Sequence, residues 1–182
     1  MSRPLLLSLL GAGCLFGATA ASALDGSAAL GTTAQGELTY RLGVSRDWQP
    51  RWLESDRGHL GGYWDAAYTH WQAGEHSAAH SLSFSPVFVY EFAAPGARPF
   101  IEAGVGVALF SATDVGHRNM SSAFHFEDRL GAGLRLEDGT RLGVRAIHYS
   151  NAGLKMPNEG IESYALFVSR PLLLVRCTMG RS

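Results

Sequence analysis

The sequence has little of several features that usually guide a first interpretation. Its 182 residues contain one lysine, Lys155, and only two cysteines, Cys14 and Cys177, and the formal net charge is −1. Because no basic stretch is present, composition argues against a nucleic-acid partner. No stretch approaches the ~18 consecutive apolar residues of a membrane-spanning helix. The length suits one ordinary domain.

The N-terminus has the features of a secretory signal peptide. Arg3 supplies a positive charge, residues 5–18 form an apolar run too short for a membrane anchor, and residues 21–23 read small-x-small. We therefore expect residues 1–23 to be removed and the mature domain to span 24–182. The residues before Cys14 lack the large aliphatic side chain of a lipoprotein signal. Cleavage would leave Cys177 without an internal disulfide partner.

Period-two alternation of apolar and polar residues dominates the rest of the chain. The alternating segments are ten residues or longer. Membrane-spanning strands need about 9–11 residues, whereas strands of soluble proteins average nearer 5–6. Seven segments show the alternation clearly. Because bacterial membrane barrels usually have an even number of strands, residues 24–33 are the candidate for an eighth strand. Residues 49–60 are expected to hold a short helix. The seven clear segments are 36–48, 61–74, 79–92, 99–112, 122–137, 141–150 and 161–172.

The two faces of each segment differ in chemistry. Within 79–92, Leu82 and Phe84 alternate with Ser81 and Ser83. A membrane barrel turns its apolar face outward and fills a narrow lumen with charged and small residues. The pattern predicts an all-β, eight-stranded antiparallel transmembrane β-barrel of the bacterial outer membrane. The short connection at 138–139 is expected on the periplasmic side. The aromatic residues expected in interfacial girdles are Trp48, Trp52, Tyr63, Trp64, Tyr68, Trp71 and Tyr90.

A candidate catalytic constellation lies at the end of segment 141–150. His148 and Ser150 are two residues apart and share a face, and the opposite face carries Arg141 and Arg145. If the arginines fill the lumen, the His/Ser pair faces lipid. Symmetric closure of the following loop would pair Ser150 with Glu162. A serine nucleophile needs a base, and the base needs an orienting carboxylate, so these residues predict a triad.

Other interpretations of the same residues stay open. A turn at 138–140 would place Asp128 opposite Ser150, where we expect it to support the site. His76 and His80 have the spacing of a helical metal pair, but on a strand we expect them to be solvated.

A histidine and a serine at a strand end are common in proteins without activity. The alternatives are therefore a structural or adhesion barrel and another lipid enzyme, such as a phospholipase or acyltransferase.

Several motifs resemble the lipid A 3-O-deacylase (PagL) family. The most specific is the run His-Tyr-Ser-Asn-Ala-Gly-Leu at 148–154, followed by Pro-Asn at 157–158 and Gly-Ile-Glu-Ser-Tyr at 160–164. The resemblance covers nearly the whole predicted mature chain. The chain departs from the usual pattern of such barrels because it continues through 176–182 after the last predicted strand.

The resemblance implies an outer-membrane esterase that removes the ester-linked 3-O-acyl chain of lipid A in lipopolysaccharide and releases a 3-hydroxy fatty acid. It places the triad on His148, Ser150 and Glu162, with the site toward the outer leaflet. Asn151 matches an asparagine critical for activity, and Asn158 and the Gly153 amide match the oxyanion-hole region. The expected mechanism requires no metal or cofactor, the barrel is expected to lie in outer-membrane lipid, and a homodimer is left open.

Overall fold

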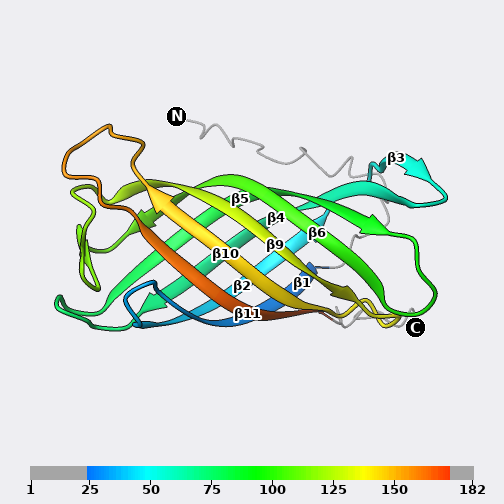
Figure 1. The fold of residues 1–182 in the computed structure, drawn as a ribbon, viewed down its shortest axis with the longest axis horizontal. Coiled ribbons are helices and arrows are strands. Elements are labelled where there is room, and N and C mark those ends of the chain that lie inside the picture. Colours follow the sequence, from blue (N-terminus) through cyan, green and yellow to red (C-terminus); the bar gives the residue numbers. More distant parts are fainter. Residues whose placement is uncertain (1–23, 173–182) are drawn as a thin grey trace, which may run out of the picture.

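The computed structural model describes residues 24–172, and all regular structure in that range is β-strand (Figure 1). No helix in the described range is long and apolar enough to cross a membrane. The strands are β1 (Leu24–Thr32), β2 (Leu38–Asp47), β3 (Trp52–Ser55), β4 (Gly58–Trp71), β5 (Ala79–Phe92), β6 (Arg98–Phe110), β7 (Asp114–Val115), β8 (Arg118–Asn119), β9 (Phe124–Arg135), β10 (Arg141–Ser150) and β11 (Ile161–Pro171).

Eight of these strands close into an antiparallel barrel, which confirms the predicted fold. The order runs β2-β1-β11-β10-β9-β6-β5-β4, and pairing of β2 with β4 completes the circle. The loops 33–37, 72–78, 111–123 and 151–160 gather at one end, which we name the loop end. The opposite end, the terminal end, carries 48–57, 93–97, 136–140 and both termini of the described chain (Figure 1).

The outer surface of the barrel is apolar. Leucines on five different strands are 54% to 69% exposed, although each lies in the middle of a regular sheet: Leu30, Leu42, Leu82, Leu130 and Leu166. The alternate positions on the same strands point inward and are buried, and many of them are charged or polar. Such a surface suits a hydrocarbon environment and confirms the predicted assignment of the two faces.

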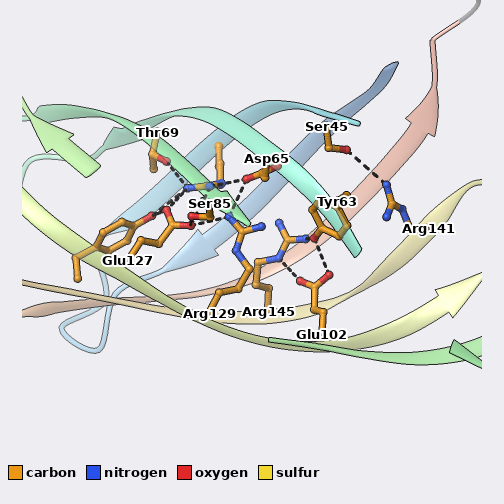
Figure 2. A network of polar contacts seen from close by, with 12 residues as sticks. Ser45, Tyr63, Asp65, Thr69, Ser85, Glu102, Glu127, Arg129, Arg141 and Arg145 are labelled. Atoms are coloured by element: carbon orange, nitrogen blue, oxygen red, sulfur yellow. Dashed lines mark hydrogen bonds and ion pairs between the residues drawn. The ribbon is translucent and has the colours of Figure 1, made fainter. Parts of the chain in front are cut away.

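Charged side chains fill the middle of the lumen (Figure 2). Arg41 pairs with Asp65 at 2.9 Å and with Glu127 at 3.2 Å. Arg129 contacts the same two carboxylates, each at 2.7 Å. Two cations and two anions thus alternate in a closed set, which compensates the loss of hydration that each charge would suffer alone. Ser85 adds a hydrogen bond of 2.7 Å to Glu127.

An apolar layer lies between this ionic network and the loop end. Its members are Trp71, Ala79, Ala108, Phe110, Val115, Met120, Ile147, Tyr149 and Ile161. Tyr149 joins the two layers, because its ring packs against Trp71 and Phe110 while its hydroxyl donates to Glu127 at 2.9 Å. Tyr149 therefore ties the end of β10 to the network.

Two details differ from the sequence predictions. Residues 49–60 contain β3 rather than a helix, because Trp52 and Ser55 pair with the start of β4 and extend its hairpin past the barrel rim. Tyr63 and Trp71 lie in the lumen and not in an interfacial girdle, because they share strand parity with the inward-facing Asp65. The predicted signal peptide, both cysteines and the tail at 176–182 lie outside the described residues.

We predict that Glu127→Ala destabilises the barrel by about 3–5 kcal/mol, because it leaves two buried guanidinium groups with Asp65 as their shared carboxylate. Thermal unfolding, followed by the change in electrophoretic mobility of the folded barrel, measures the effect. Glu137→Ala is the matched control, since Glu137 is exposed in the turn at the terminal end. Equal unfolding temperatures for the two variants would contradict the role assigned to the network.

Candidate active site

The predicted triad residues lie together on the outer surface of β10 and β11 near the loop end. His148 stands directly opposite Glu162 in the strand pairing, and its Nδ1 lies 2.9 Å from Glu162 Oε1. Both side chains are partly exposed on the lipid-facing surface, at 42% and 29%. A carboxylate bonded to Nδ1 fixes the imidazole orientation and leaves Nε2 as the atom that can exchange a proton with a nucleophile.

Ser150 lies on the same outward face, two residues beyond His148. Its partner was predicted wrongly, because Glu162 pairs with His148 and the ladder ends at Tyr149 and Ile161. The loop does not close symmetrically, since the Asn151 N–H donates 3.0 Å to the Asn158 side chain instead of continuing the ladder. Among the described residues, no hydrogen bond joins Ser150 Oγ to His148. Such contacts are often longer before substrate binds.

Asp128 is exposed on β9 and stands opposite His148, not opposite Ser150 as predicted. The turn that joins β9 to β10 explains the difference. Leu136 N–H donates to Thr140 O at 2.8 Å, so the loop centres on Asp138 and shifts the pairing by two residues. The backbone N–H of Thr140 donates to Asp138 and lowers the pKa of this turn carboxyl. Asp128 and Glu162 thus lie on either side of His148.

Gly160 allows the close approach of the 151–160 loop to the histidine. A Cβ at this position would lie 2.8 Å from His148 Cε1 and 3.4 Å from Nε2. The backbone of Gly160 also has φ of +65°, a conformation that glycine adopts without steric cost. The residue directly before β11 therefore limits the space around the imidazole, a role that the sequence analysis missed.

Asn151 is buried and ties the 151–160 loop to the neighbouring 111–123 loop. Its side-chain Nδ2 donates to Met120 O at 3.2 Å and to Lys155 O at 2.8 Å. Its Oδ1 accepts the Gly153 N–H at 2.9 Å. Since both ends of the amide are occupied, Asn151 supports the loop that follows Ser150.

The predicted oxyanion donors differ in availability. The Gly153 amide hydrogen is engaged by Asn151, so it must exchange that bond before it can serve a substrate. Asn158 is half-buried and uses Oδ1 to accept from Asn151 N–H. Its Nδ2 makes no hydrogen bond among the described residues. Of the two donors, the Asn158 side chain is therefore the more available.

An apolar groove runs along the outer surface beside His148. Its volume is about 650 Å³, and Asp128, His148 and Glu162 line one end. Small residues of the neighbouring strands, Ala103 and Ala146, form part of its floor. We name this feature the first groove. Its position beside the His/Glu pair suits an alkyl chain attached to the reacting group.

The histidines outside the site were assigned incompletely. His80 does not only face solvent, because its Nδ1 lies 2.6 Å from the Tyr68 hydroxyl and 3.4 Å from His70 Nδ1. Within residues 24–172, no group of three or more histidine, cysteine or acidic side chains could hold a metal ion.

Comparison with known proteins identifies the family. Residues 34–171 match the model of the lipid A 3-O-deacylase (PagL) family. The chain belongs to this family. The lipid A deacylase PagL of Pseudomonas aeruginosa is 56% identical over 173 residues, which cover 94% of this chain and 100% of that protein. The lipid A deacylase PagL of Bordetella bronchiseptica is 38% identical over 92 residues, which cover 50% of this chain and 51% of that protein.

A solved structure agrees with this membership. The crystal structure of the outer membrane enzyme PagL superposes with a TM-score of 0.81 and 59% sequence identity, and the match covers 81% of this chain and 99% of that one. Together with the closed barrel and its apolar exterior, these likenesses confirm the predictions of an enzyme and of a bacterial outer-membrane location.

We predict that Gly160→Ala lowers kcat on an ester substrate by at least about tenfold while the barrel stays folded, because the new Cβ displaces the His148 ring, and small misplacements of a catalytic group are costly. Steady-state kinetics on the purified protein in detergent measure the change. Gly36→Ala, a positive-φ glycine in another loop with open space around it, controls for loop strain. Full activity of Gly160→Ala would show that the close approach is not needed.

Proposed function

We propose that this chain hydrolyses the ester-linked 3-O-acyl chain of lipid A with Ser150, His148 and Glu162 as a catalytic triad. The carrying observation is the 2.9 Å contact of His148 with Glu162 beside a serine on the lipid-facing surface. Polar side chains are costly on such a surface and are functional candidates by default. Membership of the lipid A 3-O-deacylase family supplies the substrate class.

The mechanism follows from the roles of the three side chains. Glu162 holds the Nδ1–H of His148, and Nε2 accepts the proton of Ser150 as Oγ attacks the ester carbonyl carbon. The bond from the carbonyl carbon to the sugar oxygen then breaks, and His148 returns the proton to that oxygen. Water, activated in turn by His148, cleaves the acyl-enzyme and releases a 3-hydroxy fatty acid with free Ser150.

The negative charge on the carbonyl oxygen needs donors during both steps. We assign this role to the Asn158 side-chain Nδ2, with the Gly153 amide as a second donor when it leaves Asn151. One such donor typically contributes about 3–4 kcal/mol to the transition state. Asn151 is a positioning residue, because it holds the loop that carries both donors.

The surroundings of the site suit a substrate that arrives within the membrane. The first groove opens on the outer surface and receives the acyl chain, and Asp128 supports the polar end of this groove beside His148. With the termini in the periplasm, the site faces the outer leaflet, where lipopolysaccharide diffuses laterally. All three triad residues belong to one chain, so a monomer suffices, and a homodimer stays a prediction. Residues 1–23 act as the cleaved export signal.

We predict that cells producing this chain lose one 3-linked hydroxyacyl group from lipid A, and that cells producing Ser150→Ala do not. Mass spectrometry of extracted lipid A makes the comparison. Ser55→Ala, altered in the exposed β3 at the opposite end of the barrel, should behave like the parent. Unchanged lipid A in the presence of folded parent protein would contradict the proposal and favour a structural barrel. Loss of acyl groups from phospholipid alone would favour a phospholipase.

A further inference from the structure

A second apolar groove lies on the outer surface next to the first groove. It extends from the row below His148 toward β1 and the terminal end. Its volume is about 700 Å³, close to that of the first groove. We name it the second groove. The outward-facing residues that line it and not the first groove include Leu30, Thr32, Ala132, Val144 and Leu166.

The two grooves meet at three shared residues, Leu130, Ala146 and Tyr164. Ala146 pairs with Leu130 on one side and with Tyr164 on the other, so the three form one row across neighbouring strands. The next row toward the loop end is Asp128, His148 and Glu162. The next row toward the terminal end is Ala132, Val144 and Leu166.

The polar row that contains His148 therefore lies next to the row that contains Ala146, which both grooves share. From this shared row the first groove extends toward β5 and β6, and the second groove extends toward β1. The second groove offers little to a polar headgroup, because Arg145, the one charged residue in its lining, points inward and is bound to Glu102 at 2.6 Å. The remaining lining is aliphatic, glycine, threonine and Tyr164. An alkyl chain is the ligand that such a groove fits.

We propose that the second groove holds an acyl chain that the substrate retains, while the first groove holds the chain that is cleaved. This inference rests on the proposed function, since it requires the ester to lie at Ser150. A lipid with two acyl chains on one sugar can then place both chains against the barrel, one on each side of the row that contains Ala146. The retained chain thereby becomes part of substrate recognition.

The groove acts by orienting the substrate rather than by removing it from water. Bilayer lipid is as apolar as the barrel surface, so transfer of a chain between them supplies little driving force, and shape complementarity decides the contact. A retained chain in a fixed groove restricts rotation of the sugar and aligns the ester with Ser150. The second groove should therefore raise kcat/KM only for substrates that possess the second chain.

Two matched substitutions separate the grooves. Ala132→Phe fills the second groove from β9, and Ala103→Phe fills the first groove from neighbouring β6. Both alanines face outward and are exposed, so neither change crowds the lumen. The two substrates are a p-nitrophenyl ester of a 3-hydroxy fatty acid and a glucosamine phosphate with one amide-linked and one ester-linked hydroxyacyl chain, both in the same detergent.

We expect Ala132→Phe to lower kcat/KM for the two-chain substrate by about tenfold, the scale of a modest misfit in an apolar site, and to leave the one-chain ester unaffected. Ala103→Phe should lower kcat/KM for both substrates. If Ala132→Phe affects both substrates equally, or neither, the second groove does not bind a retained chain.

The electrophoretic mobility of the unheated barrel verifies folding, and Ala132→Leu replaces Ala132→Phe if the larger residue prevents assembly. Failure of the proposed function gives a different result, because the folded parent protein would then cleave neither substrate. That result would contradict both the esterase assignment and the proposed role of the second groove.

Discussion

The ionic network of Arg41, Asp65, Glu127 and Arg129 is the constraint on which the rest of the barrel depends. Eight strands enclose a lumen that side chains must fill, and the exterior has to be apolar to lie in lipid. Polar residues of each strand are therefore turned inward, where they are buried. Their charges are tolerated because each guanidinium contacts two carboxylates, and each carboxylate contacts two guanidinium groups.

The network also determines where the proposed catalytic side chains lie. Tyr149 donates to Glu127 from the lumen side of β10, so its two neighbours in sequence, His148 and Ser150, must face outward. A shift of one residue would bury both and expose Tyr149. The same hydrogen bond that completes the lumen thus keeps the His/Ser pair on the lipid side. Ile147 and Ile161 reinforce this choice from the apolar layer.

Strand parity could be predicted from the sequence, whereas strand register could not. Alternation identified the inward and outward faces because the seven clear segments show it over many residues. A slip of two residues preserves both faces, so the pattern carries no information about it. The errors at Asp128 and Glu162 are both slips of this kind. Their causes are local hydrogen bonds, Asn151 to Asn158 in one loop and the bonds around Asp138 in the other.

Other features depend on contacts between distant segments. Gly160 was visible in the sequence only as a turn residue, although its place directly before the strand of Glu162 was a usable signal. The two grooves arise because small residues such as Ala103, Ala132 and Ala146 fall on neighbouring strands in adjoining rows. Neither the row nor the groove can be derived until the register is known. The family motif indicated candidate residues of the site, but not the shape of the surface around them.

A site on the outside of a barrel faces a problem that an enclosed active site does not. Its polar groups lie beside hydrocarbon, which strengthens each electrostatic contact but penalises any group left without a partner. Pairing of His148 with Glu162 satisfies both groups before the substrate arrives. The substrate, which already lies in the membrane, needs only to be oriented. In the proposed mechanism, paired strands with grooves beside Ser150, His148 and Glu162 supply that orientation, and the bilayer itself excludes bulk water from the acyl chains.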